Sequence, residues 1–204
     1  MLALLGWNPG TEQELFSMEE LVQAFSLERV GKSGSRFDPE KARWFNHIYL
    51  QKRSDNQLAI EFREYLRIQG FFYDIVELET LVGLVKERVS FVSEIWQETE
   101  FFFRAPVCYD QVAVRKRWKE DSGKQLGELR QLLAETEDFS KDVLETAVRE
   151  WIERNGYGTG AIMNVFRLVI VGALRGPHMF DIITWIGREE TLNRIDKGLS
   201  ELGK

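Results

Sequence analysis

Two arginines near the C-terminus occupy positions where a charged side chain is unusual. Arg167 interrupts the apolar segment AIMNVFRLVIVGAL, where a long cation must pair internally or reach the edge of a helix bundle. Arg175 follows in LRGPHM, beside a glycine that lets backbones approach closely and a proline that has no N–H group. A helical hairpin tip of this kind offers carbonyl groups, a guanidinium fork and small apolar contacts. Such a tip could form hydrogen bonds with the edge of a flat polar ligand. A plain structural turn explains the same residues.

The other residues that could do chemistry form no recognisable catalytic or metal site. His47 and His178 lie far apart and in no metal-ligand spacing, and the single cysteine, Cys108, is expected to be an inert packing residue. The glycine cluster NGYGTG lacks the lysine of a phosphate-binding loop and follows a helical pattern, so we expect a helix end there. We expect no catalytic residue, no cofactor and no metal in this chain.

Composition limits the partners of the chain. The 204 residues include 27 Lys and Arg against 33 Asp and Glu, and the net charge of -6 argues against non-specific coating of nucleic acid. A local basic site remains compatible with this charge. No apolar run approaches the roughly 20 residues of a membrane helix, and the first ten residues are too short for a secretory signal. We therefore expect a cytoplasmic protein that does not contact a membrane.

Helical periodicity dominates the sequence, and several helix ends are clearly marked. Ser17 and Glu20 have the spacing of a capping box, and Asp38 precedes Pro39 as a helix cap does. Gly156 is expected to end a helix that begins near residue 140. No segment shows strand-like alternation between hairpin turns, so the predicted fold is all-α. Helices are expected within 16–25, 37–52, 58–67, 72–89, 90–103, 126–135, 139–156, 161–174 and 189–202, with a buried stripe in the second formed by Trp44, Phe45, Ile48 and Tyr49.

Two clusters of turn residues divide the helical segments. They are GKSGSRFDP and FRAPVCYD, and each lies between stretches of clear periodicity. We therefore predict three pieces, 1–36, 37–105 and 106–204.

Three segments, in this order, resemble the C-terminal tRNA-binding half of the bacterial-type glutamyl-tRNA synthetases. LALLGWNPGTEQELFSMEELVQAFSLERV is similar to the segment that follows the KMSK-type catalytic loop of that family. FDPEKARWFNHIYL resembles the signature that opens its first anticodon-binding helical domain. FRLVIVGALRGPHMFDIITWIGREETLNRI resembles the closing motif of the second.

The resemblance implies helical bundles that form the anticodon-binding cage of a class I aminoacyl-tRNA synthetase. On this basis, 1–36 is a remnant of the stem-contact region, and 37–105 and 106–204 are the two helical anticodon-binding domains. The family joins glutamate to its tRNA with ATP and Mg²⁺, but the HIGH and KMSK motifs of its catalytic domain are missing here. We therefore expect a C-terminal fragment that is inactive alone, with ATP and Mg²⁺ bound by the catalytic domain of the parent enzyme.

The resemblance also implies which residues touch the anticodon. Arg167, Gly176, Pro177 and Met179 take the anticodon-contacting places of the closing motif, with Met179 replacing a leucine, and Arg175 accompanies them at the tip. Arg88 is the candidate for an arginine that the family uses in its first anticodon domain, where the spacing varies.

The partner that the resemblance implies is tRNA-Glu, bound by a monomer that does not bind DNA. Two alternatives remain open: a helical protein-interaction scaffold without RNA binding, and an enzyme with an unrecognised carboxylate site. The scaffold predicts a large exposed apolar patch, whereas tRNA binding predicts a basic strip.

Overall fold

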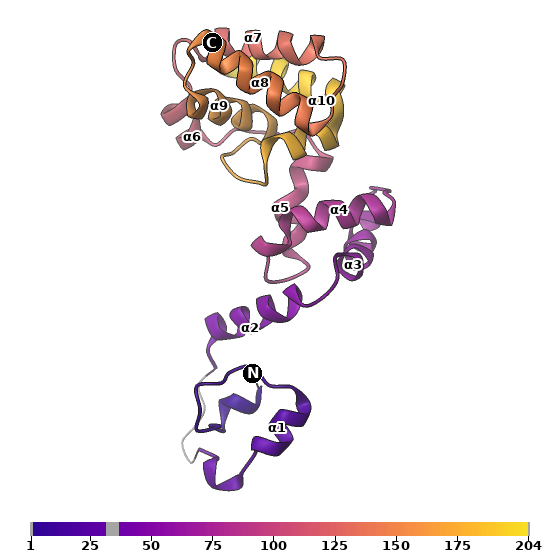
Figure 1. Cartoon of the computed structure of the whole chain (residues 1–204), viewed down its shortest axis with the longest axis vertical. Coiled ribbons are helices and arrows are strands. Elements are labelled where there is room, and N and C mark those ends of the chain that lie inside the picture. The colour runs from indigo at the N-terminus through magenta and orange to yellow at the C-terminus, as the bar shows by residue number, and fades with distance from the viewer. Residues whose placement is uncertain (1, 32–36, 204) are drawn as a thin grey trace. The chain divides into compact units, whose positions relative to one another are not determined.

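The computed structural model describes residues 2–31 and 37–203, and these residues confirm the predicted all-α fold. The described residues contain no strand, and an isolated bridge joins Trp7 to Val30. Figure 1 labels the helices α1 Met18–Ala24, α2 Pro39–Gln51, α3 Asp55–Ile68, α4 Ile75–Val85, α5 Glu94–Phe103, α6 Gln111–Arg117, α7 Ser122–Glu135, α8 Lys141–Asn155, α9 Thr159–Val171 and α10 Met179–Leu202. Short 3-10 helices are η1 Leu2–Leu5, η2 Leu27–Arg29 and η3 Lys86–Arg88.

The chain divides into two compact units, Met1–Ser54 and Asp55–Lys204. The predicted boundary after residue 36 adjoins residues 32–36, which lie outside the described residues. The predicted boundary after residue 105 lies inside the second unit. The three-domain division therefore stays a prediction, and the two units are described separately.

Local caps fix the helices of the first unit. Ser17 Oγ accepts a hydrogen bond from the Glu20 backbone N–H at 3.2 Å, and Glu20 Oε2 accepts one from the Ser17 backbone N–H at 2.7 Å. This capping box satisfies two N–H groups that the first turn of α1 leaves without helical partners. Asp38 Oδ1 caps α2 in the same way, accepting from the N–H groups of Glu40 and Lys41. The predicted starts of both helices are therefore confirmed.

The predicted buried stripe of α2 is only partly correct. Phe45 is buried, but Trp44 and Tyr49 are 41% and 46% exposed. Periodicity identifies the apolar side of a helix, but no described element of Met1–Ser54 fully covers the part of that side where Trp44 and Tyr49 lie. Trp44 packs edge-on against Phe45 instead, with 4.9 Å between the ring centroids.

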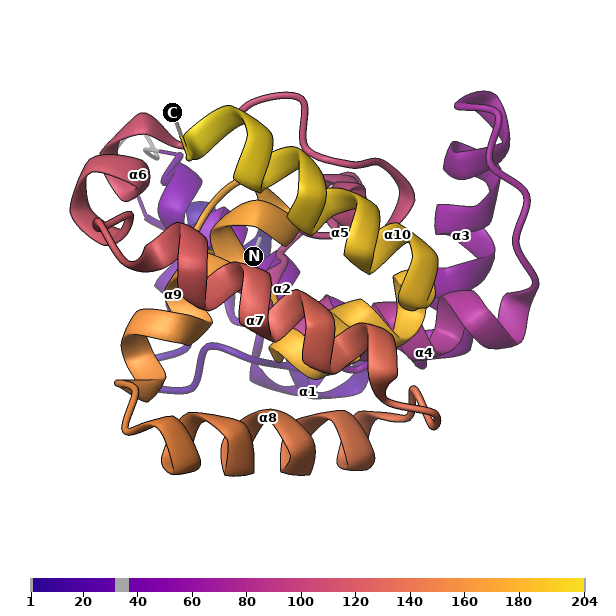
Figure 2. The ribbon, with the colours of Figure 1, turned by 90° about the horizontal axis from the view of Figure 1, so that it is seen from above.

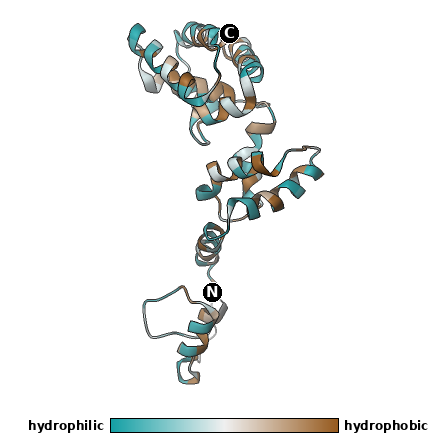
Figure 3. Ribbon diagram, turned by 45° about the vertical axis from the view of Figure 1, so that its right-hand side comes forward, coloured by the Kyte–Doolittle hydropathy of each residue, from teal (hydrophilic) through white to brown (hydrophobic). Residues whose placement is uncertain are grey.

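The second unit begins with a three-helix group, α3 to α5. The side chains of Leu58, Phe62 and Leu66 on α3 are fully or almost fully buried, as are those of Leu78 and Leu81 on α4, against which α3 packs. This burial follows from the amphipathic pattern of each helix, which Figure 3 shows as alternating teal and brown segments. The group ends at α5, which contacts both α4 and α10.

Helices α7 to α10 form the second group of this unit. Figure 2 shows α7, α8 and α10 lying near one another, and α9 packs against α7, α8 and α10. The core of the group includes Phe166, Leu168 and Ile170 on α9, all fully buried. A side chain on α10 would not fit beside Val169, since a Cβ at Gly198 would lie 2.4 Å from Val169 Cγ1. Gly187 interrupts α10 with φ 80° and ψ 170°, so α10 is bent there, and the helix expected within 189–202 forms the part after the bend.

Two features of the connection between the groups differ from expectation. Helix α6 was not predicted, because seven residues are too few to show a clear period. Its start is marked by Asp110, whose Oδ1 accepts from the N–H groups of Val112 and Ala113 at 2.8 and 3.1 Å. Cys108 is exposed and not packed, because it lies in the connection between α5 and α6, outside any helix.

Candidate nucleic-acid interface

The hairpin tip between α9 and α10 is anchored to the connection that joins α5 to α6. Gly172 ends α9 with φ 84°, and its carbonyl accepts a hydrogen bond from the Asp110 N–H at 2.8 Å. A Cβ at Gly172 would lie 2.8 Å from Pro106 Cβ, so the two backbones approach as closely as only glycine allows. The tip, residues 173–178, therefore starts from a fixed point.

Arg167 reaches the tip from the last turns of α9. Its side chain is half-buried, and Nη1 donates a hydrogen bond to the carbonyl oxygen of Arg175 at 2.9 Å. Among the described residues, no carboxylate forms an ion pair with Arg167. The charge is therefore oriented by a backbone carbonyl and is not neutralised by an acid.

Gly176 makes room for this arrangement. Its φ is +101°, and a Cβ there would lie 2.8 Å from Phe101 Cζ and 3.5 Å from Arg167 Nη1. Any other residue would strain the backbone and collide with the Phe101 ring. The tip thus passes between α5 and Arg167 because residue 176 has no side chain.

Arg88 brings a second positive charge to the same region. It is exposed at the end of η3, which directly follows α4. Burial lowers the pKa of Arg167, and the nearby positive charge of Arg88 lowers that pKa further. The two positive charges, which influence each other, thus come from the two helix groups of Asp55–Lys204. A region with two such cations attracts anions.

Arg175 is oriented toward α5. Its Nη1 donates to the Gln97 carbonyl oxygen at 2.5 Å and lies 3.9 Å from Glu98, and its guanidinium lies 5.9 Å from the centre of the Phe101 ring. These contacts brace the tip against α5. The backbone carbonyl of Arg175 orients Arg167. A direct contact between the Arg175 side chain and a ligand stays a prediction.

Pro177 and Met179 shape the tip from inside. Pro177 is buried, and the Met179 side chain, the first of α10, is only 1% exposed. Both side chains hold the start of α10 against the core, so contacts between them and a ligand stay predictions too.

Two clefts of the second unit are large enough for a small ligand. One, of about 420 Å³, adjoins the tip and is lined by Arg104, Arg175 and Gly172 among others. The other, of about 530 Å³, lies between α4, α5 and α10 and contains none of the predicted site residues. Across 2–31 and 37–203, no group of three or more His, Cys, Asp or Glu side chains is placed to hold a metal ion. None of the helices in the described ranges is both long and apolar enough to span a bilayer.

Sequence reasoning missed two cations that organise this region. Arg104 lies over the rings of Phe71 and Trp96, 5.1 and 5.4 Å from their centres. Arg194, in the middle of α10, is almost fully buried. The spacing of Arg194 four residues after Glu190 indicates a helical ion pair, but its other partners come from distant segments.

Known proteins support the resemblance seen in the sequence. Residues 57–199 match the family model described as an anticodon-binding domain. The chain is 49% identical over 202 residues to a glutamate–tRNA ligase of Porphyromonas gingivalis and 52% identical over 201 residues to one of Flavobacterium johnsoniae. These alignments cover 99% and 98% of the chain, which spans about 40% of the length of each relative.

A solved structure gives the same result. The crystal structure of a glutamate–tRNA ligase from Elizabethkingia meningosepticum, in complex with its amino acid, superposes with a TM-score of 0.89 at 36% identity. The superposition covers 98% of this chain and 40% of that structure. The predicted resemblance to glutamyl-tRNA synthetases is thus confirmed, and because the family model matches most of its length, the chain belongs to the family of anticodon-binding domains.

Proposed function

We propose that the chain is the anticodon-binding part of a glutamate–tRNA ligase and that the region around Arg88, Arg167 and the hairpin tip binds the anticodon loop of tRNA-Glu. Membership of the anticodon-binding family and the similarity to glutamate–tRNA ligases support this proposal. Anticodon loops present unstacked bases whose edges are open to hydrogen bonding, together with phosphates.

One observation carries the proposal: the positive charge of Arg88 acts on Arg167, and among the described residues no carboxylate neutralises Arg167. Two guanidinium groups held near each other repel, so the arrangement is stabilised by a ligand that carries negative charge. A guanidinium that is already fixed by a backbone carbonyl loses little freedom when it binds a base edge or phosphate. An anticodon loop supplies both kinds of group.

The proposal extends to the parent enzyme. A ligase of this class would activate glutamate with ATP and Mg²⁺ in a separate catalytic domain, so the present chain would neither bind ATP nor aminoacylate tRNA alone. We further propose that it acts in the cytoplasm as a monomer and binds neither DNA nor membranes.

A gel shift with the chain and tRNA-Glu transcripts tests the proposal. We expect the cognate transcript to bind at least roughly fivefold more tightly than one with a substituted anticodon, since a good base contact gives about 1–3 kcal/mol of discrimination. Transcripts with an altered acceptor stem but the same anticodon serve as controls and should bind like the cognate. Equal binding of all transcripts would contradict anticodon recognition, and no binding of any would favour the scaffold alternative.

A further inference from the structure

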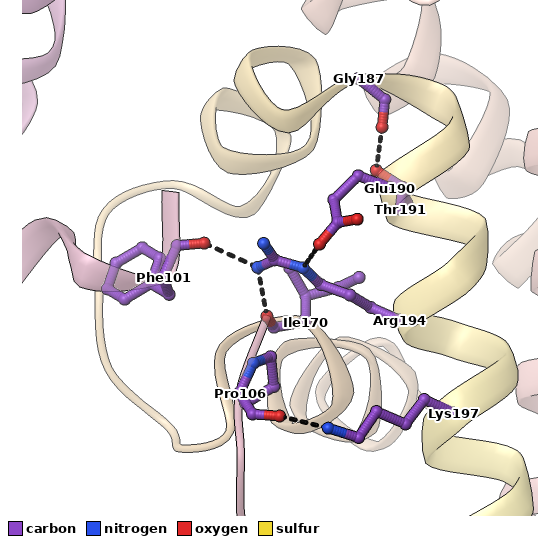
Figure 4. Close-up of polar contacts among 8 residues, drawn as sticks. All are labelled: Phe101, Pro106, Ile170, Gly187, Glu190, Thr191, Arg194 and Lys197. Carbon is purple, nitrogen blue, oxygen red and sulfur yellow. Dashed lines mark hydrogen bonds and ion pairs between the residues drawn. The ribbon is translucent and has the colours of Figure 1, made fainter. Parts of the chain in front are cut away.

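Arg194 connects three helices from a buried position in α10. Its side chain is 2% exposed, and its Nη1 donates to the carbonyl oxygens of Phe101 and Ile170 at 2.6 and 2.9 Å (Figure 4). Its Nε donates to Glu190 Oε1 at 2.7 Å, one turn earlier on the same helix. A single guanidinium therefore contacts α5, α9 and α10.

The two carbonyl partners need a donor from outside their own helices. Phe101 lies in the last turn of α5, and Ile170 lies in the last turn of α9. Carbonyl groups in a last turn have no N–H partner within the helix and carry the negative end of the helix dipole. Arg194 satisfies both with one charged group, so the ends of α5 and α9 are held at a set separation.

A second side chain of α10 also binds a backbone carbonyl near the end of α5. Lys197 Nζ donates to the carbonyl oxygen of Pro106 at 2.6 Å, in the segment that links α5 to α6 (Figure 4). Arg194 and Lys197 thus hold one side of α10 against the end of α5 and the segment that follows α5. The same segment also holds the tip, since the Asp110 N–H donates to the Gly172 carbonyl.

We propose that Arg194 is a positioning residue that sets the separation between Arg88 and Arg167. Arg88 follows α4, which packs on α5, whereas Arg167 belongs to α9. The Arg194 guanidinium binds the last turn of α5 and the last turn of α9, and so connects these two parts. This inference rests on the proposed function, because a fixed separation matters for recognition only if both arginines meet the same RNA.

An arginine of α7 that only holds two helices together provides the contrast. Arg130 of α7 binds Asp196 of α10 in a two-pronged ion pair, with N–O distances of 2.6 and 2.8 Å. That pair holds α10 to α7 and touches neither α5 nor α9. Removing it weakens the bundle without freeing the helix ends that Arg194 connects.

The first test measures the separation without RNA. Spin labels are attached to cysteines replacing the exposed Glu87, next to Arg88, and the exposed Ala161, on the same helix as Arg167, in a Cys108→Ser background, and pulsed dipolar EPR gives their distance distribution. We expect a narrow distribution in the parent and in Arg130→Met, and a broadened, shifted one in Arg194→Met. A distribution in Arg194→Met that matches Arg130→Met would overturn the inference. If Arg194→Met does not fold, Arg194→Lys, which keeps the charge but lacks the fork, replaces it with the same expectation.

The second test measures anticodon discrimination in the unlabelled chain, at a temperature where circular dichroism shows each variant folded. We expect Arg194→Met to lower the ratio of cognate to anticodon-substituted affinity about tenfold, a size typical of coupling between sites. Leu144→Ala, a truncation of a fully buried side chain in α8, is the destabilised control and should keep the ratio. An unchanged ratio in Arg194→Met would overturn the inference. A parent chain that does not discriminate would instead refute the proposed function, and the distance measurement would still decide the positioning role.

Discussion

The guanidinium of Arg167 is held by the backbone carbonyl of Arg175, eight residues along the chain, at 2.9 Å from Nη1. The contact joins the last turns of α9 to the tip that follows it. It orients a cation without neutralising it, because a carbonyl offers a partial charge where a carboxylate would offer a full one. The remaining N–H groups of Arg167 can therefore donate to a ligand.

Gly176→Ala is predicted to lower stability and distort the tip. The added Cβ would meet Phe101 and would force an alanine into a positive-φ conformation, so we expect a loss of about 1–3 kcal/mol. Chemical denaturation measures this loss. Gly127→Ala, within α7 and without an atom near its added Cβ, is the control and should be neutral or stabilising. Equal stability of Gly176→Ala and the parent would contradict the described tip.

Gly198→Ala tests the close packing of α9 against α10. Its Cβ would overlap Val169 Cγ1, and overpacking of this kind costs roughly 1–3 kcal/mol. Combining it with Val169→Ala removes the Cγ1 methyl group and leaves the Cβ of residue 169, 2.8 Å from the added Cβ, so the overlap is relieved in part. The double variant should therefore lose less stability than the sum of the two single variants, whereas simple additivity would argue against a direct contact.

Tyr109 is predicted to make stability fall at high pH. Burial, with a further contribution from Glu201, raises the pKa of its phenol from 10.0 to about 12. Between these values the unfolded chain ionises and the folded chain does not. The contribution of Tyr109 is thus fully present below pH 10 and declines by roughly 1.4 kcal/mol per pH unit as the pH rises toward 12.

Tyr109→Phe isolates this effect from the other tyrosines. The Tyr109 hydroxyl has no hydrogen-bond partner in the described part of the chain, so its removal should change stability at pH 7 by less than about 1 kcal/mol. Urea unfolding at pH 9 and pH 11 should show a smaller decline for Tyr109→Phe than for the parent. Equal declines would show that Tyr109 ionises normally.

Arg88→Gln is predicted to weaken RNA binding and its dependence on salt. Loss of one phosphate contact on a single strand reduces the slope of log affinity against log salt by ~0.7. Titrations of tRNA-Glu at several salt concentrations give this slope. Arg149→Gln, which removes an exposed arginine of α8, is the matched control and should leave the slope near the parental value. An unaltered slope in Arg88→Gln would exclude a phosphate contact by Arg88.

Helix ends were predictable because their determinants are adjacent in the sequence. Ser17 with Glu20, and Asp38 with Pro39, contain the donors and acceptors of their own caps. Gly156 likewise ends α8 in the left-handed conformation that its residue type indicates. The fold class follows from such local signals together with the apolar period of each helix.

The relationships that make the site were not predictable from the sequence pattern. The influence of Arg88 on Arg167 depends on the packing of α4, α5, α9 and α10, which no local period encodes. The partners of Arg194 are backbone carbonyls, and these have the same chemistry at every position. The exposure of Trp44 and Cys108 had a related cause, because a pattern identifies an apolar residue but does not show what covers it.

We expect Arg167 to read an anticodon base, and a double-mutant cycle tests this role most directly. Affinities of the parent and Arg167→Ala are measured for the cognate tRNA-Glu and for transcripts substituted at each anticodon position, together with the thermal stability of both proteins. We predict that Arg167→Ala costs ~1–3 kcal/mol for the cognate transcript and removes the preference at one position, where the two changes are strongly non-additive. A large loss of thermal stability with an unchanged base preference would contradict the claim and show that Arg167 is a structural arginine.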